Sequence, residues 1–190
     1  IEYPSKYEVT RLKKLNSKAA EYGVSWISNN YNEVIFSSTR EGGIIKELDA
    51  ITGQHFADFY VARQNKQGNW EEPVLADEEG INSEGSEGTP FITKNFSTMY
   101  FTRCPNHKKR ESGCQIMKSS RSGSTWSEPV TVEITSVDSL DVVGHPTLSS
   151  DELRLFFASE RRNGMGGKDI WFSERESTSE KFGRPRNLGA

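Results

Sequence analysis

The stretch that decides the fold is GHPTLSSDELRLFFASERRNGMGGKDIWFSER, residues 144–175. It holds two short runs rich in aromatic and β-branched residues, 153–158 and 169–174, which predict an antiparallel pair of strands. The connection between them is long and contains three glycines: Gly164, Gly166 and Gly167. We expect these glycines to allow a tight, irregular reversal, because glycine adopts positive φ without steric cost.

The same pattern occurs three times along the chain. Pro146-Thr147-Leu148-Ser149 aligns with Pro90-Phe91-Ile92-Thr93 and with Ser25-Trp26-Ile27-Ser28. Each repeat closes with an aromatic residue and then a proline: Trp70 and Pro73, Trp126 and Pro129, Phe182 and Pro185. The first repeat is longer because of an insertion at 43–57. A fixed period of about 40 to 60 residues is typical of propellers and other repeat arrays.

The repeat predicts an all-β fold, a β-propeller of four-stranded antiparallel blades. The expected innermost strands are residues 23–28, 88–93 and 144–149. The expected second strands are 33–37, 98–102 and 153–158, and the expected third strands are 58–63, 114–119 and 169–174. The prolines that recur before the fourth strand suit an outer edge, since proline cannot donate to a ladder. A short helix is compatible with residues 44–51, where Ile44, Ile45 and Leu48 share a helical spacing.

Apolar residues run together in the second strands, at 34–36 and 99–101, so both faces of each sheet are expected to be buried between neighbouring blades. The blades are assigned to residues 23–80, 81–136 and 137–190. Residues 1–22 are assigned to a lead-in in which 7–15 form the outer strand of the last blade of a larger ring. Propellers have about four to eight blades, so the remainder of its own propeller is an expected partner.

Composition excludes several classes of function. The chain has 190 residues, 33 % of them apolar and 11 % aromatic, with a formal net charge of -3. Acidic and basic residues are interspersed, so nucleic acid is not an expected partner. No apolar run approaches the roughly 18 residues that span a bilayer, so no direct membrane span is expected.

The pattern P-x-L-S-x-D-x-x-x-L-x-F-x-S-x-R, followed by G-x-G-G-x-D-I, resembles the TolB-like, WD-type propeller repeat of bacterial periplasmic proteins. Residues 144–175 look most like the version that precedes OmpA-like domains in outer-membrane lipoproteins of Bacteroidetes, such as the PorE-type lipoproteins of the type IX secretion system. The resemblance implies a periplasmic chain tethered to the outer membrane through other domains, with envelope proteins of the secretion system as partners. It implies no catalytic residue.

Two features are shared with sialidases. Arg40, Arg103 and Arg161 follow the second strand of each repeat, where three arginines from separate blades would imitate a carboxylate clamp. Their recurrence favours a structural role in each blade instead. Residues 119–126, SSRSGSTW, resemble an Asp-box, but Arg121 stands where the aspartate belongs.

The remaining polar candidates also favour structure. His145 precedes a proline on an innermost strand and has no cysteine or histidine partner at metal spacing. Asp58 and Asp169 begin third strands and are expected to accept hydrogen bonds from loop amides, with Cys114 at that position in the second repeat. No catalytic, cofactor-binding or metal-binding residue is therefore assigned.

Cys104 and Cys114 flank the loop CPNHKKRESGC, at the end of a second strand and the start of a third. Antiparallel neighbours place Cα atoms near the window of roughly 4.4 to 6.8 Å that a disulfide needs. Such a bridge is worth roughly 3 kcal/mol in the chain-entropy model, and it would indicate an oxidising compartment. Two free thiols are the alternative.

These observations favour a non-catalytic protein-interaction scaffold of the bacterial envelope. Within the loop of the second repeat, Lys108, Lys109 and Arg110 are the first choice for contacting an acidic partner. The rival hypothesis is a sialidase-like or other glycoside hydrolase. An enzyme should show clustered carboxylates and perturbed titrating groups in one pocket.

Overall fold

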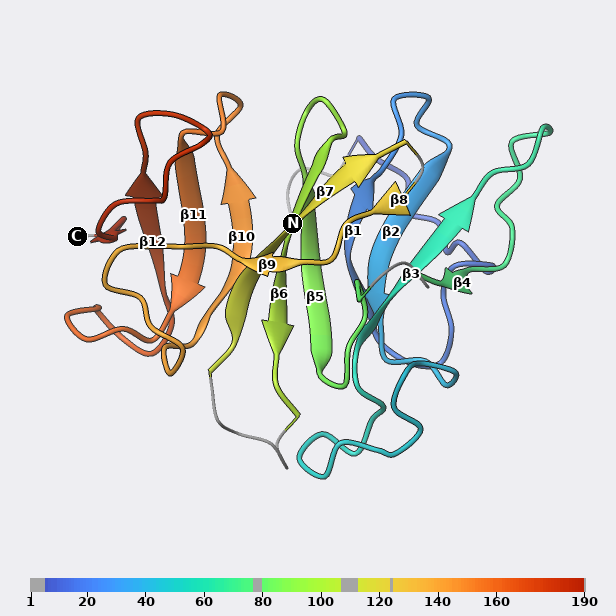
Figure 1. The fold of residues 1–190 in the computed structure, drawn as a ribbon. Coiled ribbons are helices and arrows are strands. Elements are labelled where there is room, and N and C mark those ends of the chain that lie inside the picture. The colour runs from blue at the N-terminus through green and yellow to red at the C-terminus, as the bar shows by residue number, and fades with distance from the viewer. Residues whose placement is uncertain (1–5, 77–79, 107–112, 124, 190) are drawn as a thin grey trace.

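The computed structural model describes residues 6–76, 80–106, 113–123 and 125–189, and within these ranges it contains strands and no helix. Three antiparallel sheets stand side by side in chain order (Figure 1). We refer to them as blades 1, 2 and 3. The all-β fold built from four-stranded antiparallel blades, predicted from the repeat, is confirmed.

Each blade has the same strand order. Blade 1 consists of β1 (Glu21–Trp26), β2 (Glu33–Ser38), β3 (Asp58–Arg63) and β4 (Val74–Leu75). Blade 2 consists of β5 (Ser86–Ile92), β6 (Thr98–Cys104), β7 (Gln115–Ser122) and β9 (Val130–Thr131), with the short β8 (Thr125–Trp126) paired to the end of β7. Blade 3 consists of β10 (Val143–Leu148), β11 (Arg154–Ser159), β12 (Asp169–Glu174) and β13 (Arg186–Asn187). All nine predicted strands are present, with small shifts at their ends.

The innermost strand of every blade contains a β-bulge at the same place. The bulge residues are Gly23, Thr89 and His145, with φ of 62°, 53° and 55°. This register corrects the alignment of the first repeat: Val24, and not Ser25, is equivalent to Pro90 and Pro146. The sequence comparison missed the shift because the turn after β1 has one residue more than the turns after β5 and β10.

The outer strands are only two residues long, and a proline precedes each of them: Pro73, Pro129 and Pro185. Proline fixes φ and supplies no N–H, so it suits the start of an edge strand. The predicted role of these prolines is confirmed.

The core lies between the blades. Ile35, Phe59 and Val61 of blade 1 pack against Met99 and Phe101 of blade 2, and the rings of Phe59 and Phe101 meet edge to face at 5.2 Å. A second cluster joins Tyr100 and Ile116 of blade 2 to Leu155, Phe157 and Trp171 of blade 3. Blade 2 is therefore buried on both faces, as the unbroken apolar runs predicted.

Two hydrogen bonds recur across each boundary between blades. The N–H of Glu87 donates to Ala57 O at 2.7 Å, and the N–H of Val143 donates to Cys114 O at 3.0 Å. Two residues further along the inner strand, at the bulge itself, the N–H of Thr89 donates to Ser37 Oγ. At the next boundary, the N–H of His145 donates to Thr102 Oγ1. The blades are thus fixed in register as well as packed.

One local prediction is wrong. Residues 44–51 form no helix, because the segment is held open by Asp58, which accepts from Ile44 N–H, and by an antiparallel bridge from Leu48 to His55. Residues 7–15 contain no assigned strand, and no strand of the described part of this chain pairs with them. Their predicted neighbours belong to the last blade of a larger ring and not to these three sheets, so that role stays a prediction.

Candidate functional site

The loops that join second to third strands lie along one edge of the molecule, at the bottom of Figure 1. Their described residues are 39–57, 105–106, 113–114 and 160–168, and we refer to these loops as the loop edge. Their lengths and sequences differ, whereas the strands that carry them repeat. The predicted contact residues Lys108, Lys109 and Arg110 lie outside the described residues.

Two of these loops are anchored by an aspartate at the start of the third strand. Asp58 Oδ2 accepts from Ile44 N–H at 3.2 Å, and Asp169 Oδ2 accepts from Met165 N–H at 2.7 Å. The predicted role of both aspartates is confirmed. In blade 2 the equivalent position is Gln115, and not Cys114 as expected, because Gln115 pairs with Arg103 as Asp58 pairs with Ser38.

Each anchoring aspartate explains one glycine in its loop. A Cβ on Gly164 would lie 2.1 Å from Asp169 Oδ2, and a Cβ on Gly43 would lie 2.0 Å from Asp58 Oδ2. The expectation that Gly164, Gly166 and Gly167 supply positive φ is wrong, since the left-handed residue of this loop is Asn163, with φ of 69°. Gly164 is needed for the space that its missing side chain leaves.

The loop of blade 2 is closed covalently. Cys104 and Cys114 form the predicted disulfide, and their Cα atoms are 4.1 Å apart, slightly below the expected window. Disulfides persist in oxidising compartments, so this one indicates an extracytoplasmic location. The bond fixes the two ends of the loop beside the pocket described below.

Arg40 and Arg161 follow the second strands of blades 1 and 3, whereas Arg103 lies within β6 near its end. Each of the three arginines bonds the segment that precedes its own blade. Arg40 pairs with Glu21 at 3.2 Å and donates to Leu15 O. Arg103 pairs with Glu87 at 2.8 Å and donates to Ile81 O. Arg161 acts in the same way in blade 3, where it pairs with Asp141 at 3.1 Å and donates to Ser136 O.

Each of these guanidinium groups also lies over an aromatic ring of its own blade. The distances to the ring centroids are 4.9 Å for Arg40 over Tyr60, 5.5 Å for Arg103 over Phe101 and 5.9 Å for Arg161 over Trp171. Cation–π contacts and charged hydrogen bonds within one blade leave no arginine directed to a shared centre. The three residues therefore serve structure, and they do not form a carboxylate clamp.

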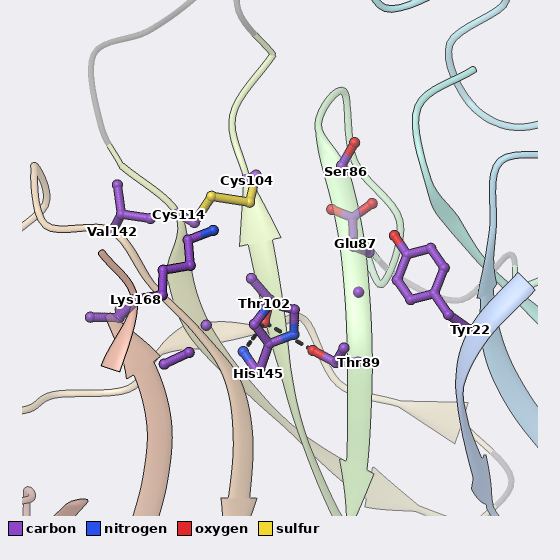
Figure 2. Close-up of a pocket in the computed structure, with 14 residues that line it drawn as sticks. Tyr22, Ser86, Glu87, Thr89, Thr102, Cys104, Cys114, Val142, His145 and Lys168 are labelled. Carbon is purple, nitrogen blue, oxygen red and sulfur yellow. Dashed lines mark hydrogen bonds between the residues drawn. A yellow bond between two sulfur atoms is a disulfide. The ribbon is translucent and has the colours of Figure 1, made fainter. Parts of the chain in front are cut away.

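A pocket of about 140 Å³ lies between the inner strands, next to the disulfide. Figure 2 shows its lining side chains, which come from all three blades: Tyr22, Glu87, Thr102, His145 and Lys168. His145 is exposed and lines the pocket, and its main-chain N–H donates the bond to Thr102 Oγ1. Among the described residues, no group of three His, Cys, Asp or Glu is placed to hold a metal ion.

Glu87 is the carboxylate of this pocket, and its oxygens are already engaged. Oε1 accepts from Ser83 Oγ at 2.6 Å and from Arg103 at 2.8 Å, and Oε2 accepts from Ser83 N–H at 3.3 Å. Burial raises the pKa of Glu87 above its ordinary value, although Ser83 and Arg103 act in the opposite direction. Burial and the Glu87 charge raise the pKa of the Tyr22 hydroxyl.

Asp58, in blade 1, is a second carboxylate with a shifted pKa, and it interacts with Glu87 of blade 2. Burial, followed by the charge of Glu87, raises the pKa of Asp58 to about 6, while Ile44 N–H and Lys46 lower it. Asp58 is almost fully buried and does not line the pocket. The two carboxylates are thus close enough to interact, but only Glu87 reaches the pocket.

Arg121, from the Asp-box-like stretch, links two blades. Its guanidinium donates to Ile27 O of blade 1 and lies 5.4 Å from the Trp126 ring centroid. Arg175 stands at the same position in blade 3, where it donates to Tyr100 Oη of blade 2 at 3.4 Å. The Asp-box-like stretch therefore includes the end of β7 and the whole of β8, and its Arg121 has a structural role.

Sequence reasoning missed the polar residues that join the blades. Ser37 and Thr102 are buried and accept N–H groups of the next blade, while buried Glu87 accepts from Ser83 and Arg103 of its own blade. The signal for Glu87 is the recurrence of Ser17 and Ser83 four residues before Glu21 and Glu87, with Ser17 Oγ bonding Glu21 at 2.5 Å.

No known protein-family profile matches the chain, and no curated protein matches it. Among solved structures, it is similar to a puromycin-hydrolyzing peptidase of Mycobacterium tuberculosis, with 12 % identity and a TM-score of 0.48. The similarity covers 93 % of this chain and 24 % of the peptidase, so the chain spans about a quarter of that protein. No helix in the described part of the chain is long and apolar enough to cross a membrane.

Proposed function

We propose that the chain is a protein-binding scaffold of the bacterial cell envelope and that it binds its partner through the loop edge. The observation that carries the proposal is the contrast between frame and loops. In all three blades an arginine is committed to the frame, while the loops that these frames present differ in length and sequence. Variable loops on a repeated frame are the usual place of binding specificity.

The contents of the pocket also support a scaffold over a hydrolase. Glycoside hydrolysis needs two carboxylates that flank the scissile bond. Here Glu87 is engaged by Ser83 and Arg103, and Asp58 lies outside the pocket. A general acid or base must be free to reach a proton of the substrate.

The envelope assignment rests on the disulfide and on the repeat pattern of residues 144–175. The disulfide suits an oxidising compartment. The resemblance to the TolB-like propeller of PorE-type lipoproteins makes the periplasm the proposed location, with tethering to the outer membrane through other domains. Proteins of the type IX secretion system are the proposed partners.

The test is recovery of envelope proteins on the immobilised chain, identified by mass spectrometry. A variant with Lys108, Lys109 and Arg110 replaced by serine tests the basic loop. A matched control replaces Lys66, Lys94 and Lys181, exposed lysines at the opposite ends of the strands. We expect an envelope protein to be recovered by the chain and by the control, and at least tenfold less by the loop variant.

Equal recovery by all three chains would exclude the basic loop and leave the rest of the loop edge as the contact. Recovery of no envelope protein, together with turnover of a glycoside substrate, would overturn the scaffold in favour of the hydrolase.

A further inference from the structure

Blade 3 has one face that no other part of the described chain covers. Phe156 and Phe172 are half-buried on this face, and Ile170 and Leu188 are 56 % and 52 % exposed. The opposite face of the same blade packs against blade 2 through Leu155, Phe157 and Trp171. The exposed face is therefore a strip of large apolar side chains that runs across β11 and β12 to the residue after β13.

Of the same four positions, all four are buried in blade 1 and two are buried in blade 2. The strand registers make Phe156, Ile170 and Phe172 equivalent to Ile35, Phe59 and Val61 of blade 1. Leu188 is equivalent to Ala76, since the N–H groups of both donate to the third strand, at Ile170 O and Phe59 O. In blade 1 these residues are at most 9 % exposed because blade 2 covers them.

Blade 2 repeats the relationship with blade 3. Tyr100 and Ile116 stand at the positions of Phe156 and Ile170, and both are 1 % exposed beneath blade 3. One face of the repeat thus always receives the next blade, wherever a next blade is present. Only in blade 3 do these positions remain open in the described structure.

We infer that this face of blade 3 is the docking surface for a further four-stranded sheet of the same repeat, supplied from outside residues 1–190. The occupant must present an apolar face like those of blades 2 and 3, which place Met99, Phe101 and Met117, or Leu155, Phe157 and Trp171, against the preceding blade. The inference is a continuation of two interfaces already present in the structure.

The edge of the surface fits such a partner. At both existing boundaries, the residue before the third strand accepts an N–H from the next inner strand: Ala57 and Cys114. Lys168 stands at that position in blade 3, so its carbonyl oxygen is the expected acceptor. The rim is polar, with Glu174 paired to Arg154 at 2.7 Å and to Arg186. An apolar centre with a polar rim is the usual anatomy of an interface.

A second copy of this chain is a poor occupant. The complementary face of its blade 1 consists of Val34, Phe36, Tyr60 and Ala62. These residues are at most 4 % exposed, because they pack with Leu15 and Trp70. Head-to-tail docking of two copies would have to displace that cover.

The test places a photo-crosslinking amino acid at Leu188 in the protein as its own cells make it. Crosslinked peptides are then identified by mass spectrometry. We expect crosslinks to a peptide outside residues 1–190 that carries the repeat pattern of apolar second and third strands. Met165, which is 71 % exposed in the neighbouring loop, is the control position, and we expect at least tenfold less of the same peptide there.

A second variant combines the crosslinker at Leu188 with Ile170→Lys, which changes an exposed side chain and should leave folding intact. We expect at least a tenfold loss of the crosslink, while Met165→Lys leaves the yield unchanged. Crosslinks to residues 1–190 of another copy would overturn the inference, as would peptides without the repeat, lipid alone, or no crosslink. The inference rests on the fold and not on the proposed function, so failure of the loop edge to bind a partner leaves it standing.

Discussion

The main-chain N–H of His145 donates a 2.8 Å hydrogen bond to Oγ1 of Thr102, across the boundary between blades 2 and 3. The N–H of Thr89 makes the equivalent bond to Ser37 Oγ at 3.2 Å. Both donors have positive φ at the bulge of an inner strand. The bulge therefore aims an N–H out of its own ladder and into the preceding blade, so one local conformation sets how the blades stack.

Replacing Thr102 by valine keeps the shape of the side chain and removes the acceptor. The N–H of His145 then loses its partner at a packed boundary, and we expect a loss of about 1 to 3 kcal/mol in the free energy of unfolding. Urea titration followed by tryptophan fluorescence measures it. Thr147→Val, at an exposed strand position, is the control and should change stability by less than about 0.5 kcal/mol.

Gly164→Ala should destabilise the chain because its Cβ would meet Asp169 Oδ2. We expect a loss of about 1 to 3 kcal/mol, the usual cost of overpacking. Gly166 has open space around its Cβ position, so Gly166→Ala should stay within about 0.5 kcal/mol of the parent. Thermal unfolding compares the two. Equal effects would show that flexibility, and not the aspartate anchor, is what this loop needs from glycine.

Removal of the disulfide should loosen the loop edge of blade 2. The double variant Cys104→Ser, Cys114→Ser should lose about 3 kcal/mol relative to the oxidised chain. Intact-mass measurement without reductant should find the parent lighter by two hydrogens than its reduced form. Full alkylation of both thiols in the native, unreduced protein would contradict the bond and the extracytoplasmic location it indicates.

Asp58 predicts a pH dependence of stability. Because its pKa is about 6 in the folded chain and near 4 when unfolded, the folded state binds more protons between these values. Stability should therefore fall as the pH rises from about 4 to 6. The raised pKa of Glu87 acts in the same direction. Asp58→Asn should flatten the slope, as followed by urea titration at several pH values; an unchanged slope would contradict the assignment.

The repeat made the fold predictable. The 56-residue step from Trp126 to Phe182 and the prolines after these residues located the sheets, since a strand that repeats must repeat its environment. The disulfide followed from the antiparallel neighbours that carry Cys104 and Cys114. The pairing of the first inner strand was misplaced by one residue, because an extra residue in its turn is invisible without the hydrogen-bond register.

The joints between blades were not predictable in the same way. Whether Glu87 is a free carboxylate or the partner of Arg103 depends on two segments meeting in space, and the spacing along the chain does not reveal it. Gly164 was assigned to the right loop for the wrong reason, since only the structure shows Asp169 Oδ2 occupying the space of its side chain. The repeat predicted that a further blade is a partner. The residues of blade 3 that it would cover follow only from the strand registers, which match Ile170 to its buried counterparts in blades 1 and 2.

The most direct test of the scaffold is a hydrogen-exchange footprint of the chain with and without the envelope protein it recovers. Binding through the loop edge predicts that amide protection rises in residues 39–57, 105–114 and 160–168. It should stay unchanged in the turns at the opposite ends of the strands, 27–32, 93–97 and 149–153. Protection confined to those opposite turns, or to the outer strands β4, β9 and β13, would contradict the account.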